Sequence, residues 1–328
     1  MGKVEKGEIG FLTKVFLSMS LVCFLILLFS SSTFSQKKQI SIGGAKAGGV
    51  FYLLAIGYAE IINRFLPEYN AIALESGVLE NIRLLGKGEV EIANANVRDA
   101  TLGYRGEKPF ATPLKNLRLG FYLGTYILHV VTLEKNNIKT VEDLKGKLVS
   151  VGAPGTVVAN NTEALLRLHN ISMKDIKSRH MDTSESMEAL GDGLIDAAIL
   201  YSALLAPAVN SLAVRHKVRL VTANEKILKA AETKENILCY FVPPQTYKGQ
   251  NEGAFAWGVV ATAYFHEATS TEDVYKWTKA IMEHKDILQK IHPSGKEVRL
   301  VTKKELGISP IPLHPGVIKY AKEIGINY

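Results

Sequence analysis

The chain has 328 residues, 47% of them hydrophobic, so it can bury a core larger than one small domain needs. Its net charge of +7 is mild, and its lysines and arginines are scattered rather than gathered into a basic patch with interleaved aromatics. This composition argues against a nucleic-acid partner, whereas it allows attraction of small anions.

The first 35 residues are typical of an export signal. Lys3, Lys6 and Lys14 precede the apolar stretch 15–29, which is short for a membrane span, and small residues follow at Thr33 and Ser35. We expect cleavage near Ser35 and a mature protein in the periplasm. Retention of the segment as a membrane anchor is the alternative.

From residue 39 onward, short β-branched runs alternate with helical patterns, which predicts an α/β fold with mainly parallel sheets. The first run, 40–43, leads into a glycine-rich loop that contains Gly48 and Gly49, and a helix over 50–65 follows with Tyr52 in its first turn. The loop lacks the spacing of dinucleotide and phosphate-loop motifs. We expect its N–H groups to hold the oxygens of an anion. A turn that needs glycine for steric reasons alone is the alternative.

Two segments of the chain are repeated in the same order. "ISIGGAKAG" at 40–48 is echoed by "VSVGAPGTV" at 149–157, and "ENIRLLGKGEVEIANAN" at 80–96 is echoed by "ESMEALGDGLIDAAILY" at 185–201. Each copy of the first segment predicts a strand followed by a loop and the start of a helix. Each copy of the second predicts a helix that ends at Gly-x-Gly and then a strand with an acid at its start, which is Glu91 in one copy and Asp196 in the other. The repeat predicts two similar lobes that face a shared cleft.

Two apolar segments are candidates for crossings between the lobes. Segment 117–134 is long enough to run from the first lobe into the second, and segment 237–247 could return. Such crossings would form a hinge. We therefore predict one lobe from 36–125 plus 245–328 and the other from 126–244.

Polar residues follow the predicted strands where open α/β sheets bind ligands. In the second lobe, Gly155 lies in a turn, Thr156 is a natural N-cap, and the helix from Val157 directs free N–H groups into the cleft. The first-lobe candidates are Glu80 and Asn81 at a helix start, and Asn94 and Asn96 at a strand end. Tyr201 matches Asn96 in the repeat and, like Tyr52, offers an apolar wall with a hydroxyl tip. Helix capping and loop solvation are the alternatives for these polar side chains.

The sequence gives little support for catalysis. It contains neither a Gly-x-Ser-x-Gly elbow nor a His-Glu-x-x-His pair, and its eight histidines have no ligand-like spacing. Cys239 is predicted to be a small buried hydrophobe. We therefore expect a protein that is not an enzyme and needs neither a metal nor a cofactor.

The motifs in their order resemble the TAXI family of solute-binding proteins from TRAP transporters. The resemblance rests on the glycine loop before Phe51 and Tyr52, on "SGVLENIRLLGKGEVEIANAN", "KTVEDLKGKLVSVGAPGT" and "GLIDAAIL", and on the closing "PLHPGVIKYAKEIG". It implies a two-lobed periplasmic binding protein fold of the type II kind, in which each lobe has a mainly parallel sheet flanked by helices and a hinged cleft lies between them. It also implies a small organic acid or an amino acid such as glutamate as ligand, and the subunits of a TRAP membrane permease as partners.

The resemblance places the glycine loop, Tyr52, Glu80, Asn81 and the second loop around the cleft. The chain departs from the family pattern at Val78, at the strand end 94–96 and at Val157, where hydroxyl or carboxylate groups give way to apolar or amide ones. These departures favour a plain carboxylate or a less polar ligand. A sensory module that signals through a receptor, and a secreted hydrolase or lyase on the same lobes, are the alternative functions.

Overall fold

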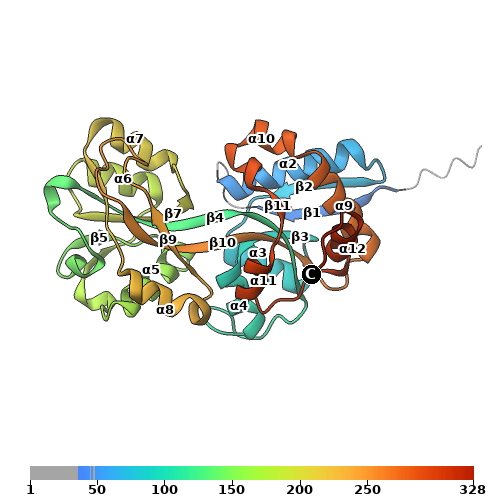
Figure 1. The fold of residues 1–328 in the computed structure, drawn as a ribbon, viewed down its shortest axis with the longest axis horizontal. Helices are drawn as coiled ribbons and strands as arrows, with labels where there is room; N and C mark the ends of the chain where they lie inside the picture. The colour runs from blue at the N-terminus through green and yellow to red at the C-terminus, as the bar shows by residue number, and fades with distance from the viewer. Residues whose placement is uncertain (1–35, 45, 47–48) are drawn as a thin grey trace, which may run out of the picture. The chain divides into compact units, whose positions relative to one another are not determined.

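The computed structural model describes residues 36–44, 46 and 49–328, and residues 39–328 form one compact unit (Figure 1). The predicted export signal and Gly48 lie outside the described residues. The unit is mixed α/β, with helices packed on both faces of one sheet. In the part of the chain that the structure describes, no helix combines the length and the apolar character needed to cross a bilayer.

One sheet of eleven strands runs through the unit. Its main order is β2-β1-β3-β10-β4-β7-β5-β6, while β8 and β11 pair with β4 and β9 pairs with β10. The strands are β1 (Lys38–Gly43), β2 (Tyr69–Leu74), β3 (Ile92–Asn96), β4 (Leu117–Leu133), β5 (Leu148–Ser150), β6 (Lys177–Arg179), β7 (Ala197–Ala203), β8 (Val218–Leu220), β9 (Leu238–Val242), β10 (Ala254–His266) and β11 (Arg299–Leu300).

The first lobe is built on β1, β2 and β3. β1 pairs in parallel with β3, with Ile42 opposite Ile92. The predicted helix after the glycine loop is confirmed as α2, which begins after Gly49 and ends at Phe65, two residues before Pro67. The helices of this lobe are α2 (Val50–Phe65), α3 (Val78–Lys87), α4 (Val97–Arg105), α9 (Thr271–Glu283), α10 (Lys285–Ile291), α11 (Lys303–Ile308) and α12 (Pro315–Glu323).

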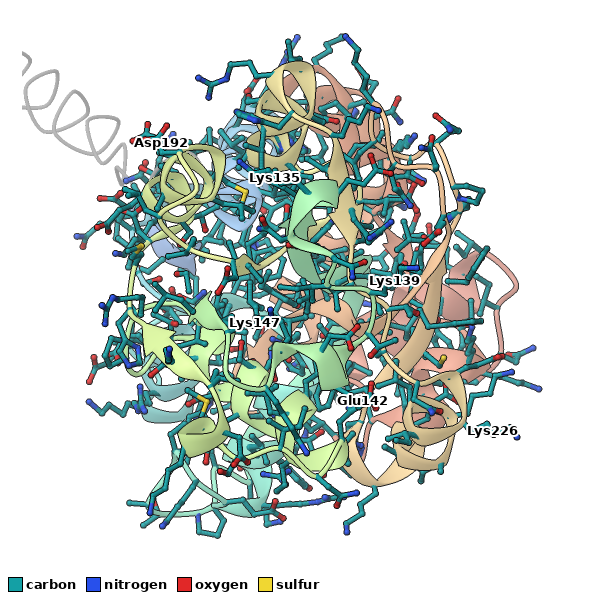
Figure 2. All side chains as sticks on the ribbon, turned by 90° about the vertical axis from the view of Figure 1, so that its left-hand side faces the viewer. Lys135, Lys139, Glu142, Lys147, Asp192 and Lys226 are labelled. Carbon is teal, nitrogen blue, oxygen red and sulfur yellow. The ribbon has the colours of Figure 1, made fainter. Side chains whose placement is uncertain are left out.

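The second lobe is built on β5, β6 and β7. β5 pairs in parallel with both neighbours, with Val149 opposite Ser178 on one side and Ala197 on the other. Figure 2 looks onto this lobe and shows Lys135, Lys139 and Lys226 on separate elements rather than in one patch. The helices of this lobe are α5 (Val157–Leu168), α6 (Thr183–Gly191), α7 (Pro207–Arg215) and α8 (Glu225–Glu235).

Two long antiparallel strands, β4 and β10, connect the lobes (Figure 1). β4 has 17 residues and occupies all but the last residue of the segment 117–134 that was predicted to cross. The predicted return over 237–247 is wrong, because β9 only pairs with the first part of β10, where Cys239 lies opposite Trp257. β10 makes the return, since farther along it pairs with β3, with Tyr264 opposite Ala93. The lobe boundaries at 125/126 and 244/245 stay predictions.

The repeat seen in the sequence has a structural counterpart in each lobe. The Glu91 carboxylate accepts a hydrogen bond from the Ser41 N–H at 2.6 Å, and the Asp196 carboxylate accepts one from the Leu148 N–H at 2.8 Å. Each acid therefore joins the start of one parallel strand to its neighbour. The helices that precede these strands, α3 and α6, both end close to a glycine with positive φ, Gly88 or Gly193.

The largest apolar core is continuous through both lobes. Phe121, Tyr126 and Leu128 of β4 and Trp257 of β10 are buried in it, together with residues of α2 on one side and of α5 on the other. A second cluster lies under α6 and α7, and a third lies under α3 and α4. The core thus holds the strand ends of both lobes in fixed positions.

Candidate functional site

Polar and aromatic side chains from both lobes meet beside the two long strands. The rings of Tyr126 on β4 and Tyr201 on β7 stack with centroids 5.5 Å apart, and the ring of Phe51 lies 4.9 Å from that of Tyr126. Asn94 in the middle of β3 donates from Nδ2 to the Phe51 carbonyl at 2.9 Å. The first turn of α2 and the strands β3 and β7 therefore form one group with β4, which we call the cleft cluster.

Several polar atoms in and around the cleft cluster are buried without a hydrogen-bond partner. They include Asn94 Oδ1, Asp99 Oδ1, Asn161 Oδ1 and Nδ2, Thr262 Oγ1, and the hydroxyls of Tyr126, Tyr201 and Tyr264. A buried polar group without a partner costs about 1–3 kcal/mol, so proteins rarely keep several of them together. A polar ligand bound among these side chains would satisfy them.

Asp99 is a buried carboxylate whose charge acts on the hydroxyls of Tyr201 and Tyr264. Its Oδ2 accepts from Asn96 Nδ2 at 2.6 Å, its N–H donates to Asn96 Oδ1 at 2.8 Å, and its Oδ1 lies 3.6 Å from Arg98 Nη1. Burial raises the pKa of Asp99, although Arg98 and Asn96 oppose that shift. Burial, and then the Asp99 charge, raise the pKa of Tyr201. The hydroxyl of Tyr201 therefore stays protonated and is available as a donor.

The predicted residues of the first lobe divide into two groups. Asn94 and Asn96 are in the cleft cluster. Asn81 is fully buried, and its Nδ2 donates to the carbonyls of Gly44 and of Asn94, the latter at 2.8 Å, so its amide shapes the glycine loop. Glu80 points to solvent, with 48% of its side chain exposed, and pairs with Arg83 at 3.5 Å.

The glycine loop is packed closely around these groups. A Cβ on Gly43 would lie 2.5 Å from Asn81 Oδ1, and one on Gly44 would lie 2.9 Å from the Cα of Tyr52. Gly49 is the N-cap of α2 and accepts from the N–H groups of Tyr52 and Leu53 at 3.0 Å. Steric need for glycine, the alternative reading of this loop, therefore holds at Gly43 and Gly44.

In the second lobe, the predicted cap of α5 is confirmed. Thr156 Oγ1 accepts from the Ala159 N–H at 3.3 Å and donates to the Ala153 carbonyl at 2.7 Å. Gly155 has φ +75° and is exposed. Val157 is buried in the apolar cluster under α3 and α4 of the first lobe. The start of α5 thus lies against the first lobe.

A cavity of about 560 Å³ adjoins the cleft cluster at Tyr126. Residues of both lobes line it, among them Val50, Tyr122, Leu205, Tyr240 and His292. Leu205 has φ +62° and is 57% exposed, and a bulky residue rarely adopts that backbone conformation.

A hydrogen bond to a buried side chain fixes the loop that carries Leu205. The N–H of Ala206 donates to the Tyr247 hydroxyl at 3.0 Å, and that hydroxyl lies 2.7 Å from Nε2 of the buried His129. The contacts hold the strained loop at the edge of the cavity.

Sequence reasoning missed five residues of this site: Asp99, Tyr126, Asn161, Thr262 and Tyr264. Tyr126 and Tyr264 lie within long apolar strands, where no polar pattern distinguishes them. Asn161 follows Val157 by one helical turn, so it shares the helix face that meets the first lobe, a spacing that was visible in the sequence. Among the described residues, no group of three or more histidine, cysteine, aspartate or glutamate side chains is placed to hold a metal ion.

Solved structures resemble this chain at low sequence identity. One comes from work on glutathione import via GshT and the cystine ABC importer TcyBC of Streptococcus mutans; it is 12% identical with a TM-score of 0.50, and the match covers 82% of this chain and 99% of that chain. This likeness shows a shared fold.

Two further structures are the periplasmic aliphatic sulphonate binding protein SsuA from Escherichia coli and the probable amino-acid ABC transporter extracellular-binding protein ytmK from Bacillus subtilis. SsuA is 15% identical with a TM-score of 0.45, covering 88% of this chain and 80% of that chain. The ytmK protein is 15% identical with a TM-score of 0.48, covering 78% and 96%.

A protein-family model supplies the stronger comparison, because it matches residues 42–325 and thus both lobes. The chain belongs to the NMT1-like family.

Proposed function

We propose that this chain is an extracytoplasmic solute-binding protein. In this proposal it captures a small organic anion, a carboxylate or an amino acid, between its lobes and delivers it to a TRAP-type membrane permease. The observation that carries the proposal is the set of buried, unpartnered polar groups contributed by both lobes at the cleft cluster.

The chemistry of these groups favours an anion. The tyrosine hydroxyls at 126, 201 and 264 and the amide of Asn161 offer hydrogen-bond donors in a site shielded from water. Hydrogen bonds from such donors to an anion are stronger in a low-dielectric site than in water. The Asp99 carboxylate lies beside Arg98 and Asn96, and its Oδ1, which accepts no hydrogen bond although it lies 3.6 Å from Arg98 Nη1, can accept one from an ammonium group. A plain carboxylate or an amino acid therefore suits the site.

A structural neighbour and the sequence motifs support the proposed partner and location. The Streptococcus mutans structure comes from work on import through an ABC importer, in line with delivery of a small solute to a membrane permease. The order of the chain's motifs supports the TRAP type and the TAXI subfamily, and the apolar segment at 15–29 supports export to the periplasm.

Calorimetric titration and thermal shift test the proposal on purified protein that has been unfolded and refolded to remove bound ligand. The ligand panel consists of mono- and dicarboxylates, amino acids and neutral sugars. A ligand at 100 times its Kd adds about 2.7 kcal/mol of stability, which raises the melting temperature by several degrees. We expect a shift with carboxylates or amino acids and none with neutral sugars.

Two variants locate the ligand. Tyr201→Phe removes one hydroxyl of the cleft cluster. We expect it to raise the Kd about 10-fold, because that factor corresponds to about 1.4 kcal/mol, the contribution of one buried hydrogen bond. Thr278→Val is the matched control, because it removes another buried hydroxyl without a partner, on α9 outside the cleft. Equal affinity in both variants would argue against a site at Tyr201. Turnover of the ligand would instead indicate an enzyme.

Delivery to a TRAP-type permease is tested by uptake. Membrane vesicles that contain TRAP permease subunits should accumulate the ligand only when the protein is added. Uptake through an ABC permease alone would contradict the TRAP assignment and leave the binding function intact.

A further inference from the structure

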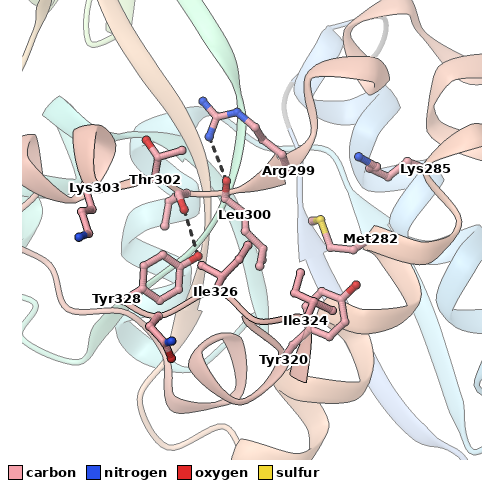
Figure 3. A pocket seen from close by; sticks show the side chains of 12 residues that line it. Met282, Lys285, Arg299, Leu300, Thr302, Lys303, Tyr320, Ile324, Ile326 and Tyr328 are labelled. Carbon is pink, nitrogen blue, oxygen red and sulfur yellow. Dashed lines mark hydrogen bonds between the residues drawn. The ribbon is translucent and has the colours of Figure 1, made fainter. Parts of the chain in front are cut away.

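A second cavity, of about 530 Å³, lies within the first lobe (Figure 3). It is formed by the end of α9, the start of α10, strand β11 and the residues that follow α12. Its size falls in the range of sites for small organic ligands. Its apolar lining includes Met282, Leu300, Tyr320, Ile324, Ile326 and Tyr328.

Part of this apolar lining is exposed. Ile324, Ile326 and Tyr328 keep 50%, 38% and 39% of their surface in contact with solvent. Tyr328 is nevertheless fixed, because its hydroxyl donates to the Val301 carbonyl at 3.0 Å. Figure 3 shows Tyr328 and Ile326 facing Met282 and Tyr320 across the cavity. An apolar body placed between them would remove this surface from water.

Cationic side chains line the cavity, and aspartate and glutamate side chains do not. Its lining includes Lys285, Arg299 and Lys303 but neither aspartate nor glutamate. Lys285 is half-buried, and among the described residues neither its ammonium group nor that of Lys303 has an ion-pair or hydrogen-bond partner. A lysine stem can lie on apolar surface while its ammonium group stays accessible to an anion.

The Arg299 guanidinium, in contrast to the two lysines, forms an ion pair within the protein. Its Nη2 donates to Glu305 at 2.9 Å, and its guanidinium lies 3.8 Å from the ring centroid of Tyr122. Glu305 is held in turn by the N–H and the hydroxyl of Thr302. Arg299 and Glu305 thus pair with each other, which leaves Lys285 and Lys303 as the cationic lining residues that no described side chain pairs.

We propose that this cavity binds a small amphipathic anion, an alkyl carboxylate of medium chain length. The alkyl chain lies on the apolar lining and the carboxylate pairs with the Lys285 ammonium, with Lys303 adding to the positive potential. This site is separate from the cleft, and the proposal does not depend on what the cleft binds.

Calorimetry with decanoate, below the concentration at which it forms micelles, tests the proposal on the full chain. We expect decanoate to bind, acetate to bind at least 20-fold more weakly because it lacks the chain, and decyltrimethylammonium to give no measurable binding. Lys285→Met keeps the length of the side chain without its charge and should weaken decanoate binding at least 5-fold. Ile326→Ser acts on the apolar lining and should also weaken it at least 5-fold.

Lys322→Met is the matched control, since this lysine lies on α12 and does not line the cavity. It should leave the affinity for decanoate unchanged. The proposal is overturned if decanoate does not bind, if the cationic detergent binds equally well, or if Lys285→Met and Ile326→Ser both leave decanoate binding unchanged. In the last case decanoate occupies another place, such as the cleft.

Discussion

The Arg98 guanidinium lies 3.3 Å from the Glu235 carboxylate, and this ion pair joins α4 of the first lobe to α8 of the second. Both side chains are nearly buried, with 7% and 12% exposed. The guanidinium also lies 5.2 Å from the ring centroid of Trp257 on β10. Arg167 of α5 reaches the same carboxylate at 3.2 Å, but 60% of its side chain is exposed. The Glu235 carboxylate thus accepts hydrogen bonds from one buried and one exposed arginine.

This difference predicts unequal effects of two arginine substitutions. Arg98→Ala leaves Asp99 buried without its cation and Glu235 with only the exposed Arg167, and we expect it to lower the free energy of unfolding by about 3–5 kcal/mol. Arg167→Ala should lower it by about 1 kcal/mol or less, as for other exposed ion pairs. Urea denaturation of both variants measures the difference. Equal losses would show that Arg98 is not the residue that compensates the buried charge.

The close packing of the glycine loop predicts a second pair of effects. Gly43→Ala places a Cβ 2.5 Å from Asn81 Oδ1, so we expect a loss of about 1–3 kcal/mol, the usual cost of overpacking. Gly77→Ala is the control, because the space around that Cβ is open and the φ of −106° suits any residue. Because Gly77 is the N-cap of α3, Gly77→Ala should lower the free energy of unfolding by less than about 1 kcal/mol. A neutral Gly43→Ala would mean that Asn81 moves aside without cost.

Thr156 is expected to act on the stability of α5. Thr156→Val removes the hydroxyl that caps the helix, at a cost of about 1 kcal/mol, whereas Thr156→Ser keeps the cap and should cost less. Thermal unfolding monitored by circular dichroism separates the two. Identical melting temperatures for valine and serine would indicate that the hydroxyl contributes no capping energy.

His129 predicts a loss of stability in acid. Burial lowers the pKa of His129 to about 4, while the unfolded side chain titrates near its ordinary value of 6.5. Between these two pH values the unfolded chain binds a proton that the folded protein excludes. The stabilisation is therefore fully present above pH 6.5, is lost as the pH falls toward 4, and amounts to about 3 kcal/mol.

Urea midpoints measured from pH 7 to pH 4 test this expectation. His129→Gln removes the titrating group, so the free energy of unfolding of this variant should fall less steeply between pH 7 and pH 4. The difference from the unsubstituted protein is the contribution of His129. His314, whose pKa burial also lowers to about 4, still contributes in that variant. An unchanged slope in His129→Gln would contradict the role given to His129.

The sequence was sufficient to predict the α/β class, α2, the capped α5 and the first crossing between the lobes, which the structure shows to be strand β4. These elements carry local signals, such as the helical spacing of apolar residues before Pro67 and the N-cap at Thr156. The pairing of the two acids, Glu91 and Asp196, was predictable because the repeat aligned them. Each acid then proved to bond the neighbouring strand in the same way.

The return strand and half of the candidate site were not predictable in this way. β10 is apolar on both faces, and a buried run without alternation does not reveal which strands it joins. Tyr126 and Tyr201 meet because β4 pairs with β7, with Leu128 opposite Tyr201, a contact between residues far apart in the sequence. Local patterns carry no information about such contacts.

The sharing of β4 and β10 between the lobes has a consequence for how the protein can be divided. A fragment limited to one lobe would expose the edge of β3 or of β7, together with the half of the apolar core that the long strands supply. Open strand edges and exposed apolar surface favour aggregation. The two lobes therefore form a single folding unit, and neither is a module that evolution or an engineer can transplant without both long strands.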